Sequence, residues 1–507
     1  MIGNEEAERT HRNRRMVAVV VLAAIMVLAI ALRFWRLGHW GFEGDEIHTL
    51  RDSLRPTLRN PRPLIYFLNY YVVRPLVPLD ELGLRLLPAI FGTLAVPALF
   101  LVIRRLAGVR AALFGALLLT VNAFQVYQSQ YARYWSLVFL LSTVYPFALY
   151  LGVRDRRVRD LVIGVVTCVL AVLAHPVAIF PLGGLILFAL THVRREHLAR
   201  LWSRRAFRWG LLLALLLAAG VGLRFISLLT NWIYARPLAH VRDHLFRGTG
   251  GAAMKQVALL LSYMDSLTLP LALVGALGIY LLWLGRDRSL AVLLVCLFAV
   301  PVGAILLISL RTAVSTTYLT PSAPIVFVAA GIFLDRLASL DWELRPRWLL
   351  SAAVAILIVA AGAPTLISQY LNGRRPDFRG AALWLRARLG PGDMVFSEQF
   401  RVVTHYLPEA RIRPLTDDPA PLAEAALGLD RQPHGGALWI VAPAPTHALR
   451  TTLKEIGLAD WIYGNCQLRN TIGVGRLDVR QQFLQIYRCP SGPAEDARPP
   501  GVARPGQ

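Results

Sequence analysis

The chain has 507 residues, of which 56% are hydrophobic and only 17% are charged, against about 25% charged residues in soluble proteins. Its apolar residues form runs of about 20, the length of a membrane-crossing helix, which excludes a soluble, disordered or disulfide-scaffold protein and an outer-membrane barrel. The net charge of +23 is almost entirely arginine, much of it in short linkers between these runs. We therefore expect a polytopic α-helical membrane protein that contacts anionic membrane lipid and no nucleic acid.

The first apolar run, 16–35, follows a basic flank and is not followed by a small-residue cleavage site. It predicts an uncleaved transmembrane helix with a cytoplasmic tail at 1–15, rather than a signal peptide. Together with the later runs it predicts about 11 transmembrane helices within 16–368. The later runs are 85–103, 111–127, 134–153, 160–174, 177–192, 209–229, 266–285, 289–310, 318–335 and 348–368.

Alternate linkers between these runs differ in charge. The linkers at 128–133, 175–176 and 311–317 are short and poor in charge, whereas the arginine-rich ones are 104–110, 154–159, 194–208, 286–288 and 336–347. The positive-inside rule places the arginine-rich linkers in the cytoplasm. An odd number of spans then places the C-terminal part outside, which predicts a multi-pass protein of the inner (plasma) membrane.

Two outer linkers are long, at 36–84 and about 230–265, and both place aromatic residues beside basic ones. Such segments commonly lie as helices in the membrane interface, and we expect at least one such helix in each.

The composition changes after 368. Short β-like runs at 393–396 and 437–442 alternate with helix-like stretches at 377–389 and 420–428. This predicts a small extracytoplasmic α/β domain over 374–490. The segment 491–507 is rich in Pro, Gly and Ala and is expected to be disordered.

Two adjacent carboxylates, Asp45 and Glu46, lie in the first outer linker about ten residues beyond the first span. Such a pair can act as a general base or as a metal ligand, or it can simply form a solvated face. Its aromatic and basic surroundings, including Trp40 and Arg51, favour a chemical role.

Polar residues also gather at the outer ends of later spans. Gln130, Tyr131 and Arg133 lie in a polar stretch that either lines a substrate pocket or makes interhelical hydrogen bonds. His175 precedes Pro176 at a helix junction, where it is structural or faces a substrate.

Arg311, near Tyr318, either snorkels or binds a lipid phosphate. In the second long linker, Arg236 and Arg247 fit an anionic headgroup or the ordinary basic character of an interfacial helix. The sequence contains no P-loop, dinucleotide fingerprint, CxxC or HExxH motif.

The order of these features resembles the GT-C membrane glycosyltransferases, in the branch of protein O-mannosyltransferases and lipid A aminoarabinose transferases. The resemblance covers about 16–490 and begins with the outer-linker Asp45-Glu46 pair. It continues with Ser129-Gln130-Tyr131-Ala132-Arg133, then Leu173-Ala174-His175-Pro176, Tyr318-Leu319 with Pro321 and Pro324, and Asp377-Phe378-Arg379-Gly380.

The resemblance implies transfer of a sugar from a polyprenyl-phosphate carrier to an acceptor on the outer face, by a single inverting displacement. Asp45 is then the catalytic carboxylate and Glu46 its partner. The donor phosphate would be held by Arg311, with Arg236, Arg247 and Arg133 as further contributors. The expected substrate pocket includes Gln130, Tyr131, His175 and Tyr318. The acceptor stays open between a lipid, a protein and a polysaccharide.

One position departs from the family pattern, because relatives often have glutamate where this chain has Tyr131. Either that acid is dispensable, or the acceptor or metal site differs, so no cofactor follows with certainty and a divalent metal stays open. A transporter of lipid-linked or small solutes is the alternative function. It would normally show two similar halves with broken helices, and no such repeat is evident.

The four cysteines divide into two pairs by environment. Cys168 and Cys296 lie inside apolar runs, whereas Cys466 and Cys489 lie in the expected outer domain. An oxidising compartment permits a disulfide between the second pair, which would close the end of the domain, and two free thiols are the alternative.

Overall fold

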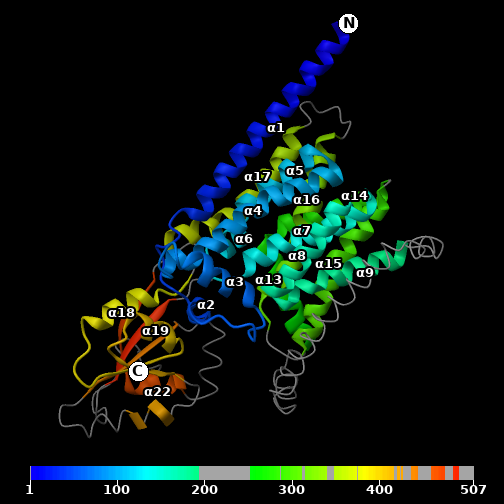
Figure 1. Cartoon of the computed structure of the whole chain (residues 1–507). Coiled ribbons are helices and arrows are strands. Elements are labelled where there is room, and N and C mark those ends of the chain that lie inside the picture. Colours follow the sequence, from blue (N-terminus) through cyan, green and yellow to red (C-terminus); the bar gives the residue numbers. More distant parts are fainter. Residues whose placement is uncertain are drawn as a thin grey trace, which may run out of the picture. The chain divides into compact units, whose positions relative to one another are not determined.

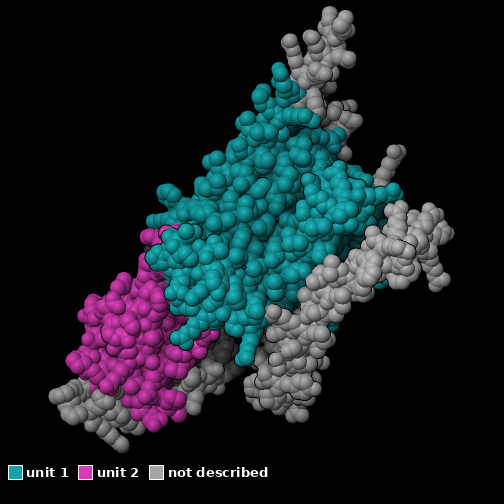
Figure 2. Space-filling view, viewed as in Figure 1, with its two compact units in different colours: residues 1–37, 52–79, 83–366 teal, residues 38–51, 80–82, 367–507 magenta. Residues whose placement is uncertain are grey.

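The computed structural model describes residues 2–192, 252–285, 287–310, 314–339, 348–373, 375–415, 420–422, 424–425, 436–443, 458–473 and 483–489. The chain divides into two compact units (Figure 2). Residues 1–37, 52–79 and 83–366 form the first, which we call the helical unit. Residues 38–51, 80–82 and 367–507 form the second, which we call the sheet unit.

The helical unit is a bundle of apolar helices (Figure 1). Its first part contains α1 (Ile2–Phe34), α3 (Pro63–Leu68), the π-helical turn η1 (Asn69–Val73), α4 (Glu81–Ala107), α5 (Val109–Val121), α6 (Ala123–Ser129), α7 (Trp135–Arg154), α8 (Val158–Ala174), η2 (Pro176–Ile179) and α9 (Phe180–His192). Its second part contains α13 (Ala252–Leu267), α14 (Leu269–Leu284), α15 (Arg288–Ser309), η3 (Thr316–Ser322), α16 (Ala323–Ser339) and α17 (Trp348–Asn372). Three helices, α2 (Gly44–Leu54), α4 and α17, have residues in both units.

Among the described residues, six helical segments are long and apolar enough to cross a membrane. Two bent pairs, α5 with α6 and α13 with α14, raise this to eight if each pair is one span. The structure therefore supports a multi-pass membrane protein with six to eight candidate spans, and the expected count of about 11 is not confirmed. The run 209–229 lies outside the described residues.

Each bent pair breaks at a residue that hydropathy does not single out. The Asn122 side-chain oxygen accepts a hydrogen bond from the Gln125 backbone N–H at 3.1 Å and so caps α6, where the chain turns by 63°. Thr268 has φ +73° between α13 and α14, where the chain turns by 95°. The Asn122 side chain also donates to the Leu267 carbonyl at 3.1 Å, which ties the two breaks together.

Ion pairs join four of the arginine-rich linkers to one another at residues that the structure describes, whereas 194–208 lies outside those residues. The Arg105 guanidinium lies 2.6 Å from Asp155 and 2.7 Å from Asp160, which connects the α4–α5 linker with the α7–α8 linker. Two further pairs, Arg110 with Asp335 and Arg336 with Asp287, join the ends of α5, α16 and α15 at 2.8 and 2.6 Å. These linkers therefore share one end of the bundle, as the charge alternation requires.

The sheet unit contains a five-stranded mixed sheet in the order β2-β1-β3-β5-β4. Strand β1 (Met394–Ser397) lies between β2 (Arg411–Pro414) and β3 (Leu438–Pro443), parallel to both. Strand β5 (Leu484–Cys489) runs antiparallel to β3 and to β4 (Gln467–Ile472). The remaining described helices of this unit are α18 (Phe378–Arg386), α19 (Phe400–Tyr406) and α22 (Leu458–Asn465).

The sheet unit follows the predicted alternation of strands and helices, with shifted ends. Strands β1 and β3 each begin and end one residue later than the β-like runs 393–396 and 437–442. The expected helix 420–428 has described helical residues only within 420–425. Residues Cys466 and Cys489 form a disulfide that joins the start of β4 to the end of β5. The segment 491–507 lies outside the described residues.

Candidate functional site

Asp45 and Glu46 occupy the first turn of α2, where negative charge interacts favourably with the helix dipole. The Glu43 backbone N–H donates to Glu46 Oε2 at 3.0 Å, and the Glu46 N–H donates back to the Glu43 carbonyl at 2.9 Å. This reciprocal pair fixes the start of the helix in the manner of a capping box. Asp45 is exposed, whereas Glu46 is buried, so the two adjacent acids lie in different environments.

Glu46 forms a buried ion pair within the sheet unit. Its Oε2 lies 3.0 Å from a terminal nitrogen of Arg375, and the two side chains are 0% and 2% exposed. The Arg375 Nε also donates to the Gly373 carbonyl at 3.2 Å. Removing one member of such a pair leaves an uncompensated buried charge, at a cost of about 3–5 kcal/mol.

A second group of contacts holds the segment before α2. The Tyr406 hydroxyl donates to Glu81 at 2.7 Å and accepts the Phe42 backbone N–H at 2.6 Å. Arg379 lies 3.5 Å from Glu81 and donates to the His39 carbonyl at 2.8 Å. These contacts join all three chain segments of the sheet unit.

In the helical unit, two arginines converge on one phenol. Arg62 donates a hydrogen bond to the Tyr134 hydroxyl, and Arg133 donates to the same oxygen at 3.2 Å. Both guanidinium groups also lie over the Tyr134 ring, at 5.2 and 4.9 Å from its centroid. The result is a concentration of positive charge beside an aromatic surface.

His175 packs into the same cluster, with its ring 4.8 Å from Tyr134, 4.9 Å from Trp135 and 5.5 Å from Tyr318. Its Nδ1 accepts the Val177 N–H at 3.2 Å and caps η2, which leaves the proton of a neutral ring on Nε2. Burial, with Arg62 and Arg133 as further causes, holds the pKa of His175 well below its ordinary value.

Of the expected substrate-pocket residues, Gln130 and Tyr131 lie apart from these ring contacts. The Gln130 amide donates to the Leu32 and Trp35 carbonyls at 3.1 and 3.0 Å, at the end of α1. The Tyr131 ring stacks on Tyr127 with centroids 5.3 Å apart. The structure thus brings Arg133, His175 and Tyr318 into one neighbourhood and places the Gln130 side chain against another helix.

Three expected phosphate-binding residues, Arg236, Arg247 and Arg311, lie outside the described residues. Sequence reasoning missed Arg62 and Arg375, each of which immediately precedes a proline. The residue before a proline has a restricted backbone, and this was the only local feature that distinguished these two arginines. Within the described part of the chain, no group of three or more His, Cys, Asp or Glu side chains is arranged to hold a metal ion.

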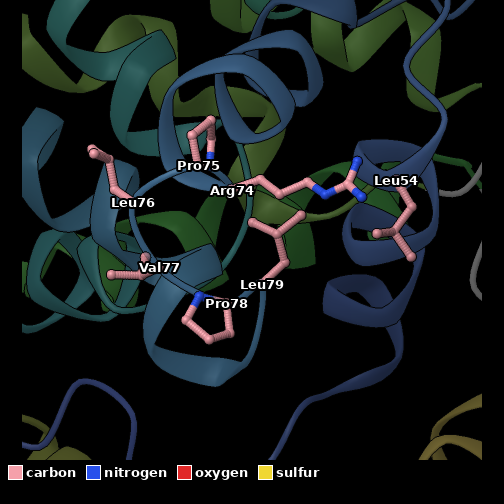
Figure 3. Close-up of a pocket in the computed structure, with 7 residues that line it drawn as sticks. All are labelled: Leu54, Arg74, Pro75, Leu76, Val77, Pro78 and Leu79. Carbon is pink, nitrogen blue, oxygen red and sulfur yellow. The ribbon is translucent and has the colours of Figure 1, made fainter.

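A pocket of about 480 Å³ lies in the first long linker (Figure 3). It is lined mainly by apolar side chains, with the Arg74 side chain extending toward Leu54. The Arg74 guanidinium lies 4.9 Å from the centroid of the Tyr70 ring. None of the expected site residues lines this pocket.

No protein-family model and no curated protein matches the sequence. Solved structures do match. ArnT from Cupriavidus metallidurans in the apo state gives a TM-score of 0.53 at 14% identity, covering 94% of this chain and 98% of that one. The Archaeoglobus fulgidus oligosaccharyltransferase in the apo form gives 0.53 at 12% identity, covering 91% of this chain and 74% of that one.

Both matches extend over most of this chain. The chain therefore has the fold of the GT-C membrane glycosyltransferases, which confirms the fold that the order of sequence motifs implies.

Proposed function

We propose that the protein is a membrane glycosyltransferase that moves a sugar from a polyprenyl-phosphate carrier to an acceptor on the outer face of the membrane. The GT-C fold makes this class the leading one. The observation that carries the proposal is the pairing of an exposed carboxylate, Asp45, with a buried and ion-paired neighbour, Glu46. One acid is accessible to a reactant while the next is held in place.

In the proposed reaction, Asp45 accepts the proton of an acceptor hydroxyl as that oxygen attacks the anomeric carbon. The new bond forms between the acceptor oxygen and the anomeric carbon, with inversion. The bond from the anomeric carbon to the phosphate oxygen breaks, and its electron pair leaves with the lipid phosphate. Asp45 then returns the proton to solvent.

The departing phosphate gains negative charge, which fixed cations stabilise. We assign this role to Arg62 and Arg133, because both guanidinium groups converge on Tyr134 in the helical unit. Arg311, Arg236 and Arg247 remain proposed contributors. The Tyr318 and His175 rings would then border the same phosphate site.

The proposed orientation places the N-terminus and the arginine-rich linkers in the cytoplasm, and the sheet unit on the outer side. The ion pairs that join these linkers at one end of the bundle support this arrangement. Labelling of single introduced cysteines with a membrane-impermeant reagent on intact cells tests it. A cysteine in the sheet unit should react and one in the 154–159 linker should not.

The test of function is incubation of purified protein with labelled polyprenyl-phosphate sugars and membrane extract. We expect label to move from the donor lipid to another molecule. Asp45→Asn should lower the rate by about 10²–10⁴-fold, the usual contribution of a general base. The matched control is Glu409→Gln, a carboxylate 54% exposed in the sheet unit, which should leave the rate unchanged.

Label that stays on the donor lipid under all acceptor conditions would count against a transferase. Full activity of Asp45→Asn would remove Asp45 from the catalytic role while leaving the class of enzyme intact. Repeating the assay with a chelator, followed by re-addition of Mg²⁺ or Mn²⁺, shows whether a divalent metal takes part.

A further inference from the structure

Asp45 lies in the first turn of α2, and residues 41–43 immediately before this helix are neither helix nor strand. The direction of the first helical turn therefore depends on contacts with other parts of the chain. In the sheet unit those contacts come largely from residues after α17, far away in the sequence.

One of these contacts joins two buried charges. Glu46 Oε2 accepts both the Glu43 N–H and an Arg375 N–H, each at 3.0 Å. One oxygen therefore ties the start of α2 to its own linker and to the segment after α17. Without Arg375 the buried carboxylate would have to take up a proton or turn toward solvent, and either change disturbs the first helical turn.

The backbone around Arg375 is shaped for this contact. Gly373 has φ +73°, a conformation that favours glycine, and its carbonyl accepts from Arg375 Nε. A Cβ at this position would lie 2.7 Å from atoms of the Trp40 ring, so the ring packs directly on the glycine backbone. Across the helix start, a Cβ on Gly44 would lie 2.2 Å from the Gln399 side-chain oxygen. Side chains therefore pack closely on the backbone at both Gly373 and Gly44.

We propose that Arg375 is a positioning residue for the catalytic carboxylate. Its guanidinium holds Glu46, and through the first turn of α2 it sets the direction of the adjacent Asp45. This inference rests on the proposed function for its kinetic consequence, but the physical contact can be tested without activity. It assigns to the sheet unit a direct part in the reaction rather than a separate binding task.

The experiment compares Arg375→Gln, Arg375→Lys and the double variant Glu46→Gln/Arg375→Gln with the wild type. We expect Arg375→Gln to lower kcat by about 100-fold, the size of effect that small misplacements of reacting groups produce, with donor KM within about twofold. Arg375→Lys keeps the charge but loses the forked geometry, and should lose about tenfold. The double variant removes both charges and should recover to within about tenfold of the wild type.

The independent readout is hydrogen exchange of the backbone amides in 38–51. Exchange should quicken in Arg375→Gln and return toward the wild-type rate in the double variant. Arg388→Gln is the matched control, because Arg388 is exposed in the same unit and contacts Trp384 of the preceding helix α18. It should change neither kcat nor exchange.

Two results would overturn the inference: unchanged kcat in Arg375→Gln, or a double variant no more active than the single one. If the wild type transfers no sugar at all, the proposed function fails, and hydrogen exchange alone then decides the contact. Unchanged exchange in Arg375→Gln would show that the ion pair does not hold the segment.

Discussion

The Arg62 guanidinium donates a hydrogen bond to the Tyr134 hydroxyl, 72 residues further along the chain. The bond joins the first long linker to the start of α7. Because Arg133 donates to the same oxygen, two positive charges are held close together at Tyr134. Such a concentration of positive charge attracts an anion.

Arg62→Ala should therefore weaken binding of the lipid-phosphate donor. We expect its Kd to rise about tenfold, the equivalent of one charge-assisted hydrogen bond. The effect should shrink at high salt, because added ions screen the attraction. Titration of purified protein with a polyprenyl phosphate measures it, and the exposed Arg59→Ala is the control. Equal donor affinity in both variants would remove Arg62 from the phosphate site.

His175 gives a prediction for pH dependence. Its folded pKa lies below the unfolded value because of burial and the nearby Arg62 and Arg133. Below about pH 6.5 the unfolded chain therefore binds a proton that the folded chain does not, and the free energy of unfolding falls as pH decreases. Above that pH the histidine is neutral in both states, so it does not make the free energy of unfolding depend on pH.

The matched variant is His175→Asn, because asparagine can also cap η2 but does not titrate. Thermal unfolding in detergent should show a melting temperature that drops between pH 7 and pH 5 less steeply in the variant than in the wild type. Parallel curves for the two proteins would contradict this account of His175.

Arg33 is a buried charge inside an apolar helix, and it caps another helix. Its terminal nitrogens donate to the Leu119 and Thr120 carbonyls at 3.3 and 3.2 Å, near the end of α5. Arg33→Met leaves these acceptors without that donor and should destabilise the fold by about 1–3 kcal/mol. Thermal unfolding tests this against the exposed Arg15→Met on the same helix, whose melting temperature should match the wild type.

The disulfide between Cys466 and Cys489 closes a loop with a sequence separation of 23. In the chain-entropy account, its removal should cost about 3 kcal/mol. The variant Cys466→Ser/Cys489→Ser should therefore unfold its sheet unit at a lower temperature, measured by hydrogen exchange on heating. Cys168 and Cys296 are free cysteines and serve as internal controls for non-reducing mass spectrometry. Detection of four free thiols in protein recovered from membranes would contradict the bond.

Much of the helical unit could be predicted because its signals are local. Runs of apolar residues predict helices. The alternation of arginine-rich linkers predicts which linkers lie at the same end of the bundle, and the ion pair of Arg105 with Asp155 joins two of these. The number of spans could not be predicted in the same way. Hydropathy is averaged over a window of residues, so the average does not reveal a break at a single residue. The helix is broken by a side-chain cap at Asn122 and by a positive φ at Thr268.

The candidate site was predictable only in part, for a related reason. The sequence singles out Asp45 and Glu46 by their adjacency, and Arg133 and His175 by their place at helix ends. It does not single out Arg62 or Arg375, because each meets its partner only through the fold. Apart from its place before a proline, each is one of 54 lysine and arginine residues and has no local feature that indicates its partner.

The ion pair of Glu46 and Arg375 joins residues 329 positions apart, and this has a consequence for synthesis of the chain. Glu46 emerges from the ribosome early, whereas Arg375 follows only after nearly all the helices of the bundle. Until then the acidic segment lacks the partner that shapes it. In the proposed mechanism the nascent protein stays inert while it is being inserted, and it acquires activity only once the last part of the chain has been made.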